Sequence, residues 1–512
     1  MGRINTNVQS LIARNVLATH NGELNTSLER LSTGLRINRG KDDPAGLIAS
    51  QSLKAEQRGI DEAIKNADRA DQVANIAGGG LDEISGLLTE LQSAVVQAAN
   101  KSGQSKDERD AGQLQVDSIL QTIDRLSSAT NFQGIKLLNG GLDFRLSGIA
   151  TGVNDVRVNS AKYVGKSLNV DVNVIASAQQ AGLFLSAGGS ALNLDNGSAL
   201  VLDIGGAQGS RQLSFSSGTS LSQIKDAINT FTDVTGVEAV VSGTGVLIRS
   251  KEYGSDQFVS VKVANAGGIN STTNGDNGTP TRGIYNRQAG AFNSNNTTIN
   301  TTFANASNGV QDSGTDVQAF VNGVKATANG NKIKVNTDFL SFDATLSASV
   351  AQAVGSVGGS SPAFVIAGGG AQFSIGSRVD IGAQATLGIR DASSSHLGTK
   401  DLGYLNSLAS GRTNNLVTGD TTQAQKIVSE AIRQVSTQRA LIGSFQKNVL
   451  GSTTRALSVT GENSAAAQSS ISDADFAAET AQLTRSQILV SSSTQVLQLA
   501  NQAPQSALQL LG

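Results

Sequence analysis

Residues 24–50 read LNTSLERLSTGLRINRGKDDPAGLIAS. In the first half of this stretch the leucines recur four, three and four residues apart, at Leu24, Leu28, Leu31 and Leu35. This spacing puts one narrow apolar stripe on a single face of a helix, the pattern of a coiled coil. Because so narrow a stripe does not build a globular interior, it predicts that this helix pairs with another helix.

The predicted helix extends upstream of these leucines. Ile4, Val8 and Leu11 keep the same spacing, so the helix is expected to begin within the first few residues. We therefore count these three residues with the leucines as one half of a helix-pairing interface.

A turn is expected to follow this helix. Gly40 and Pro44 interrupt the helical pattern. Asp42 and Asp43 stand just before the next helical segment, where carboxylates accept N–H groups and favour the positive end of the helix dipole. Asp42, Asp43 and Pro44 therefore predict a turn between a terminal helix and a second helix.

The pairing partner is expected at the other end of the chain. Phe476, Leu483, Val490 and Leu497 recur every seven residues, which is the coiled-coil period, and Leu508 lies further along the same segment. These residues form the other half of the predicted interface.

The start of this last helix is expected near residue 472. Ser472 is followed three residues later by Asp475, a spacing typical of a capped helix start.

Periodicity alone leaves two interpretations of the terminal helices open. The two terminal helices pair within one chain and have no further role, or they also carry assembly with other chains.

Helical periods also favour long helices over residues 44–100, from residue 105, and from residue 420 towards Gly451. Gly78, Gly79 and Gly80 are expected to interrupt the first of these, since each glycine costs ~1 kcal/mol relative to alanine in a helix.

The helix from residue 105 opens with a capping box formed by Ser105 and Glu108. Its inner face is expected to start at Leu114 or Val116.

The middle of the chain, from about residue 145 to 400, has a different pattern. Short alternating runs separated by Gly, Asn and Ser replace the helical period and predict strands. We expect two small subdomains, about 160–265 and 310–395, joined by a Gly/Asn/Thr-rich loop between 267 and 308. Residues 224–254 predict a small helix packed on a hairpin.

Composition argues against several functional classes. Aromatic residues make up 4%, with no Trp, so few residues are available for large apolar pockets. Charged residues make up 16% and the net charge is −2, which argues against binding of nucleic acid or anionic membrane. The absence of cysteine excludes disulfides, thiolate zinc sites and a cysteine nucleophile. No apolar run is long enough for membrane insertion, and no cleavable signal peptide is recognisable.

Catalytic and cofactor sites are not expected. His20 and His396 are the only histidines, and neither has metal-ligand spacing around it. The acidic pairs Asp42/Asp43 and Asp473/Asp475 stand at predicted helix starts, where capping explains them. We therefore expect a protein that is not an enzyme and that holds no cofactor or metal.

Several short segments resemble the terminal signatures of the bacterial flagellins. They are LSTGLRIN at 31–38, KDDPAGL at 41–47, NFQGIKLL at 131–138, SDADFAAE at 472–479, RSQIL at 485–489 and ANQAPQ at 500–505. The resemblance covers roughly residues 1–143 and 402–512.

This resemblance implies an α+β multidomain fold. Its N- and C-terminal helices pair as a coiled-coil or helical-bundle shaft, and a β-rich outer region fills the centre. The implied domains are an inner terminal coiled coil (1–43 with 465–512), a helical shaft (44–143 with 402–464) and a variable outer region (144–401).

The function implied by the resemblance is structural. The chain would polymerise through its terminal helices into the hollow flagellar filament and act as a propeller for motility. Implied partners are other flagellin subunits, hook–filament junction proteins, the filament cap and an export chaperone. The implied location is extracellular, after export by the flagellar type III apparatus without a cleaved signal peptide. Because unpacked helices are marginal in water, the terminal helices are expected to order on burial against neighbouring subunits.

The family also has a helical stretch that an innate immune receptor detects. The corresponding residues 88–100 read LTELQSAVVQAAN. Glu90 and Gln92 occupy places where a basic residue is usual, and a charge change at an interface lowers affinity and on-rate. The resemblance therefore implies weak receptor recognition here.

Two alternatives remain. A hook–filament junction protein would have similar termini, although the DDPAG turn and the ANQAPQ tail favour a filament subunit. Residues 145–400 could instead carry an enzyme or adhesin displayed on a filament. No zinc-protease motif supports the enzyme, and a binding role stays open.

Overall fold

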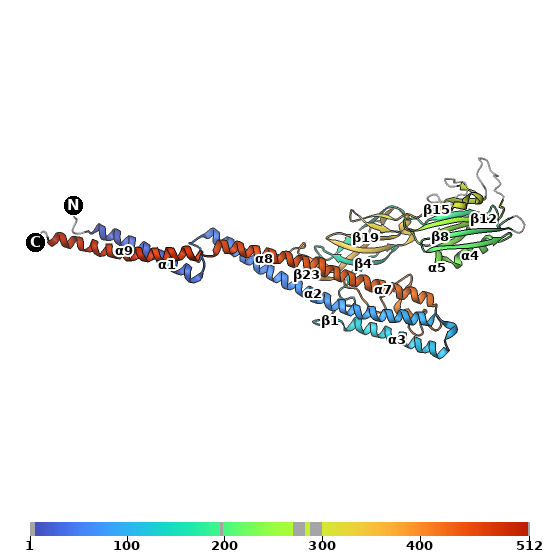
Figure 1. Ribbon diagram of the computed structural model, residues 1–512, viewed down its shortest axis with the longest axis horizontal. Coiled ribbons are helices and arrows are strands. Elements are labelled where there is room, and N and C mark those ends of the chain that lie inside the picture. Colours follow the sequence, from blue (N-terminus) through green and yellow to red (C-terminus); the bar gives the residue numbers. More distant parts are fainter. Residues whose placement is uncertain (1–5, 195–197, 270–281, 287–299, 510–512) are drawn as a thin grey trace. The chain divides into compact units, whose positions relative to one another are not determined.

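The computed structural model describes residues 6–194, 198–269, 282–286 and 300–509. The chain forms two compact units, one of Met1–Gln72, Phe373–Ala385 and Ser444–Gly512, the other of Val73–Gln372 and Thr386–Gly443. Long helices come from both ends of the sequence, and strands fill its middle (Figure 1). The predicted α+β class with paired terminal helices is therefore confirmed.

The first unit is mostly helical. It contains α1 (Val8–Thr33), the beginning of α2 (Pro44–Ala98), the π-helical segment η4 (Phe445–Leu450), α8 (Gly451–Ser472) and α9 (Phe476–Gln509). Helices α2 and α8 pack closely, since a Cβ on Gly461 would lie 3.4 Å from Cγ2 of Ile60, which is 2% exposed. One hairpin, β23 (Ala371–Ser374) and β24 (Gln384–Leu387), also contributes residues to this unit.

The predicted interruption of α2 is wrong, because the helix runs without a break through Gly78, Gly79 and Gly80. A Cβ on Gly80 would lie 2.7 Å from Thr130 Oγ1 and 2.8 Å from Leu138 Cδ1, so this glycine permits close packing. A Cβ on Gly78 or Gly79 would meet nothing within 4 Å. Tertiary packing outweighs the weak helix propensity of the three glycines.

Two predicted helix boundaries near the C-terminus also differ. Helical backbone continues past Gly451, from α7 (Thr421–Ser444) through η4 and α8. Ser472 is the last residue of α8 rather than the start of α9. Asp475 is the cap of α9, because its Oδ1 accepts the N–H groups of Ala477 at 2.9 Å and Ala478 at 3.1 Å.

The second unit has a helical part built from the end of α2, α3 (Lys106–Ala129) and α7, with short turns η1 (Lys101–Gly103) and η3 (Leu405–Leu408). The predicted capping box at Ser105 and Glu108 is confirmed. Val116 is fully buried whereas Leu114 is 68% exposed, so the inner face of α3 begins at Val116. Other core side chains of these helices are Ile84, Leu88, Leu91, Ile119, Ile123, Ile427, Ala431 and Val435.

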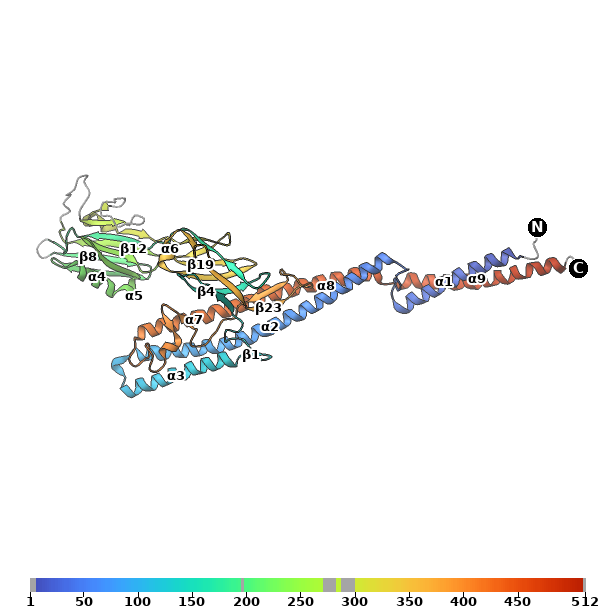
Figure 2. The same ribbon diagram turned by 180° about the vertical axis from the view of Figure 1, so that it is seen from behind.

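The strands of the second unit form two cores. The inserted module, residues 181–313, has the sheet orders β10-β11-β7-β13-β14 and β15-β12-β8-β9. The split module, residues 144–178 with 317–366, has the orders β17-β16-β6-β21, β18-β19-β20-β4 and β3-β22-β5. Figure 2 shows both modules from behind. Among the described residues, the strand pairings in both modules are antiparallel, for example β12 with β8 and β20 with β4.

The strand bounds in these modules follow chain order. They are β3 (Phe144–Ser147), β4 (Val153–Ala161), β5 (Leu168–Val170), β6 (Val172–Ala176), β7 (Gly182–Ser186), β8 (Ala199–Gly206), β9 (Gly209–Ser216), β10 (Val237–Ser242), β11 (Gly245–Ser250), β12 (Phe258–Ala266), β13 (Gly283–Asn286), β14 (Asn300–Thr301), β15 (Val310–Ser313), β16 (Gln318–Val321), β17 (Val324–Lys325), β18 (Thr327–Asn329), β19 (Lys332–Asn336), β20 (Leu340–Leu346), β21 (Gly355–Val357) and β22 (Phe364–Gly369). Smaller pairs are β1 (Asn131–Phe132) with β2 (Ile135–Lys136), and β25 (Gly398–Thr399) with β26 (Gly403–Tyr404).

The helices of the modules are short. They are α4 (Leu221–Thr230), α5 (Thr232–Thr235), η2 (Phe303–Asn308) and α6 (Ala348–Gln352). The predicted small helix on a hairpin is confirmed, because α4 precedes the β10–β11 hairpin and Ile224 and Ile228 share its core.

The division of the middle region differs from the predicted subdomains 160–265 and 310–395. β6 pairs with β16, so residues 168–176 belong to the same core as residues 317–366. Part of the predicted loop 267–308 lies outside the described residues, but its described part includes β13, β14 and η2. Ile284 and Phe303 from that part are buried in the inserted module.

The two ends of the inserted module meet. Gln179 and Thr315 exchange backbone hydrogen bonds of 2.9 Å and 3.0 Å. The module is therefore an insertion that starts and finishes at one point of the split module.

Candidate assembly interface

Helices α1 and α9 form an antiparallel pair (Figure 1). Near one end, Asn7 Nδ2 donates to the carbonyl of Ala500 at 2.8 Å. Near the other end, Arg30 Nη1 lies 3.7 Å from Glu479 Oε2. The N-terminal end of α1 therefore lies beside the C-terminal end of α9, and the C-terminal end of α1 lies beside the N-terminal end of α9. The two helices run in opposite directions.

The contact between them has coiled-coil spacing on both helices. Its half-buried and buried residues recur three and four apart, and we call them the seam. On α1 the residues with this spacing are Ser10, Ala13, Leu17, His20, Leu24, Ser27 and Leu31, and on α9 they are Glu479, Leu483, Ser486, Val490, Ser493, Leu497 and Ala500. Glu29, Arg30 and Leu489 are also half-buried but are not counted in the seam.

Large and small residues face each other across the seam. The register set by the end contacts puts Leu24 at the level of Ser486, which is fully buried, and Leu483 at the level of Ser27, which is 2% exposed. A leucine opposite a serine lets the helices approach closely, but it buries less apolar surface than a leucine pair. The seam therefore holds the pair together only weakly.

Among the described residues, buried polar atoms without a hydrogen-bond partner lie in the seam, at Glu479 and Ser486, and beside it, at Arg30. They are Glu479 Oε1, Ser486 Oγ and Arg30 Nε. A buried polar atom without a partner costs about 1–3 kcal/mol. This cost further limits the stability of the isolated pair.

The seam includes Leu24, Leu31, Leu483, Val490 and Leu497 from the interface that the sequence predicts. The remaining described members lie outside it with large exposed fractions. These are Val8 at 51%, Leu11 at 47%, Leu28 at 46%, Leu35 at 38% and Phe476 at 62%. Ile4 lies outside the described residues, and Leu508 belongs to α9 but its side chain is not described.

Five further apolar residues of these helices are exposed, and sequence reasoning missed them. They are Ile12 at 53%, Val16 at 42%, Ile488 at 64%, Val496 at 54% and Leu499 at 69%. Val8, Ile12 and Val16 recur every four residues, a spacing that could have revealed a second stripe on α1. We call these five residues, together with Val8, Leu11, Leu28, Leu35 and Phe476, the outer apolar set.

The turn after α1 is held by backbone hydrogen bonds to carboxylates. Gly34 ends α1 in the left-handed conformation, with φ of 71°. Asp42 Oδ2 accepts the N–H groups of Asn38 at 3.1 Å and Arg39 at 2.8 Å. The hydrogen bond from Arg39 N–H favours the charged carboxylate and is the main reason that the pKa of Asp42 is lowered. Asp43 Oδ1 accepts the N–H of Gly46 at 2.8 Å, in the first turn of α2.

The segments that follow α1 and precede α9 are joined by a short backbone clasp. Arg36 N–H donates to Ser472 O at 2.7 Å, and Ala474 N–H donates to Gly34 O at 2.9 Å. Arg36 Nη2 also donates to Ile471 O at 2.6 Å. The clasp fixes where the α1–α9 pair begins.

The other predicted sites have ordinary surroundings. Glu90 is exposed and Gln92 is half-buried on α2. His20 pairs with Glu23 at 3.1 Å, and His396 with Asp391 at 3.0 Å.

In the part of the chain that the structure describes, no group of three or more His, Cys, Asp or Glu side chains is arranged to hold a metal ion. Over the same residues, no helix combines the length and apolar character needed to cross a membrane.

Comparisons with known proteins find three family descriptions in this chain. Residues 4–142 match "Bacterial flagellin N-terminal helical region", residues 425–511 match "Bacterial flagellin C-terminal helical region", and residues 200–248 match "Flagellin hook IN motif". The last match covers strand β8 through the β10–β11 hairpin.

Full-length relatives are also found. A flagellin of Salmonella typhimurium is 31% identical, and one of Salmonella choleraesuis is 29% identical, each over 99% of both chains. A crystal structure of the flagellar cap protein FliD from Escherichia coli is 19% identical over 46% of this chain and 66% of that chain. Its TM-score of 0.27 is too low to establish a shared arrangement.

Proposed function

Because this chain belongs to the bacterial flagellins, we propose that α1 and α9 together carry its assembly interface. The protein is not an enzyme. It is a structural subunit that polymerises through its terminal helices into the hollow bacterial flagellar filament, the propeller of motility. Its full-length relatives are named flagellins, which favours the filament subunit over the hook–filament junction protein.

In this proposal the two groups of predicted residues have different roles. The seam residues Leu24, Leu31, Leu483, Val490 and Leu497 join the two helices within a subunit. The outer apolar set contacts neighbouring subunits, and Ile4 and Leu508 are proposed to extend it. The observation that carries the proposal is the exposure of the outer apolar set, in which Val8, Ile12 and Val16 share one face of α1, since exposed apolar side chains gathered on one face mark interaction sites.

The domain roles follow from this assignment. We propose that residues 1–43 with 465–512 form the inner terminal domain and that 44–143 with 402–464 form the shaft. Residues 144–401 then form the outer region. The turn at Asp42, Asp43 and Pro44 connects the first two of these domains.

The protein is an extracellular component of the flagellar filament. We propose that it reaches this location through the flagellar type III apparatus without a cleaved signal peptide. Junction proteins, the filament cap and an export chaperone are proposed as further partners from the family resemblance. Weak recognition by the innate immune receptor is proposed from Glu90 and Gln92.

Truncation tests the role of α9. A chain that stops after Thr480 lacks most of the α9 side of the seam, including Leu483, Val490 and Leu497. We expect a folded monomer that forms no filaments in negative-stain microscopy, while thermal unfolding of the second unit is unchanged. Normal filaments from the truncated chain would refute the proposed interface.

A further inference from the structure

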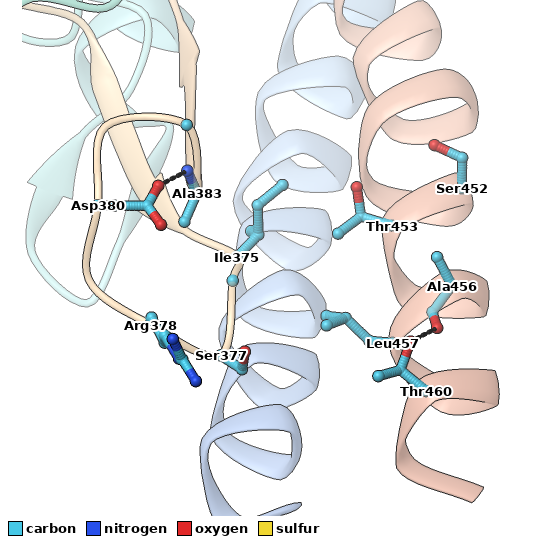
Figure 3. Close-up of a pocket in the computed structure, with 12 residues that line it drawn as sticks. Ile375, Ser377, Arg378, Asp380, Ala383, Ser452, Thr453, Ala456, Leu457 and Thr460 are labelled. Atoms are coloured by element: carbon cyan, nitrogen blue, oxygen red, sulfur yellow. Dashed lines mark hydrogen bonds between the residues drawn. The ribbon is translucent and has the colours of Figure 1, made fainter. Parts of the chain in front are cut away.

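An open groove lies beside α8 in the first unit. One wall is the loop between β23 and β24, and the other is the Ser452–Thr460 stretch of α8 (Figure 3). Its volume is about 640 Å³, and its lining includes Ile375, Leu457 and Ala456. The groove is therefore large enough for several side chains of an incoming helix.

The loop wall is built into the unit. A Cβ on Gly59 of α2 would lie 2.5 Å from the carbonyl oxygen of Ser377, so the loop backbone approaches α2 where a glycine leaves room. Within the loop, Asp380 Oδ1 accepts the N–H of Ala383 at 2.7 Å. At the base of the hairpin, the rings of Phe373 and Phe445 lie 6.1 Å apart. These contacts fix the loop against the helices.

Two neighbouring side chains of the β23–β24 loop, Val379 and the groove-lining Arg378, are exposed. Val379 at the loop tip is 92% exposed. Arg378 is exposed, and it makes no ion pair or side-chain hydrogen bond with any described residue. The only other ionisable group in the lining, Asp380, already accepts a backbone N–H. A small ligand would find few converging polar groups here, whereas an apolar surface bearing a carboxylate would find complementary groups.

The same chain carries such a surface on α3. Asp107, Asp110 and Leu114 are spaced three and four residues apart, so they share one helix face. All three are exposed, Leu114 at 68%. Neither aspartate makes an ion pair with another described residue. An apolar side chain beside two free carboxylates matches the apolar groove with its free arginine in both polarity and charge.

We propose that this groove receives the Asp107–Leu114 face of α3 from a second copy of the chain. The inference rests on the proposed function, because a polymer holds identical subunits at high effective concentration. The groove is also continuous in the chain with the proposed interface, since α8 leads through residues 473–475 directly into α9. Leu114 enters the groove, and Asp110 pairs with Arg378 at its rim.

Charge exchange tests this pairing. Arg378→Glu alone and Asp110→Arg alone each place like charges together at every contact, and we expect the critical concentration for polymerisation to rise about threefold to tenfold. In the double variant every contact regains opposite charges, so the critical concentration should return towards that of the natural chain. Lys166→Glu, at another exposed cation, is the matched control and should change nothing.

Several outcomes would overturn the inference. Single variants that polymerise like the natural chain would exclude the contact. A double variant impaired by the sum of the two single effects would exclude the pairing of these residues. Monomer melting temperatures, which should be unchanged in all variants, separate an assembly defect from a folding defect. If the natural chain itself forms no filaments, the proposed function fails, and that result is distinct from failed rescue.

Discussion

Truncating the outer apolar set on α1 should weaken the filament without weakening the monomer. The variant is Ile12→Ala with Val16→Ala. Their side chains are 53% and 42% exposed, so about half of each is left to be buried by a neighbouring subunit. Full burial of one such side chain contributes about 1.5–3 kcal/mol, so burying the exposed half of both contributes about 1.5–3 kcal/mol. Because alanine keeps its β-carbon and retains part of this burial, the pair loses about 1–2 kcal/mol of assembly free energy.

That loss predicts a measurable change in polymerisation. Since 1.4 kcal/mol corresponds to a factor of about ten, the critical concentration should rise about 5-fold to 30-fold. Alanine has a higher helix propensity than isoleucine or valine, so α1 in the monomer should not be loosened. Sedimentation after seeding measures the critical concentration, and circular dichroism measures monomer unfolding.

The control removes an exposed valine elsewhere. Val164, which is 85% exposed in the outer region, is changed to alanine and should leave the critical concentration unaltered. An unchanged critical concentration for the Ile12/Val16 variant would refute the role of this stripe. A large fall in monomer melting temperature would mean that the stripe is already buried before assembly.

Three other perturbations have defined outcomes. Leu31→Asp with Leu35→Asp places one carboxylate in the seam and one on the outer apolar set, so filaments should disappear from negative-stain images while the second unit melts normally. Replacing residues 181–313 by a short Gly/Ser linker should leave filament formation intact, because Gln179 and Thr315 already exchange backbone hydrogen bonds; a chain that no longer folds would contradict this. The lowered pKa of Asp42 means that its stabilisation of the turn is fully present above the ordinary aspartate pKa and is lost as pH falls through the lowered value. The protection factor of the residue 39 amide, the exchange rate of an unprotected amide divided by its own rate at the same pH, should therefore fall in acid, and in Asp42→Asn it should be lower already at neutral pH.

The sequence predicts the helix pair because its leucines have a period. Leu24, Leu31, Leu483, Val490 and Leu497 have coiled-coil spacing, and all five lie in the seam. Leu28 has the same spacing but is exposed, since seam membership depends on the facing helix as well as on the period. Buried serines of the seam give no sequence signal, because serine is usually a surface residue.

Long-range packing explains the other differences. Thr130 and Leu138 occupy the space that a side chain at position 80 would fill. The sequence around Gly80 does not indicate this contact, because both residues lie far along the chain. The strand at 172–176 pairs with the strand at 318–321, more than a hundred residues later, so local patterns could not assign it to the split module. Asp42 and Asp43 could be placed in the turn because their role is local.

Hydrogen exchange of the terminal helices, compared between monomer and filament, tests the central claim most directly. The weak seam and the exposed outer apolar set predict that amides of residues 8–33 and 476–502 exchange readily in the monomer. In filaments the same amides should be protected about 100-fold or more, while buried amides of α3 change little. Equal protection of the terminal amides in monomer and filament would show that the pair is already stable alone, and would contradict the claim that these helices become ordered on assembly.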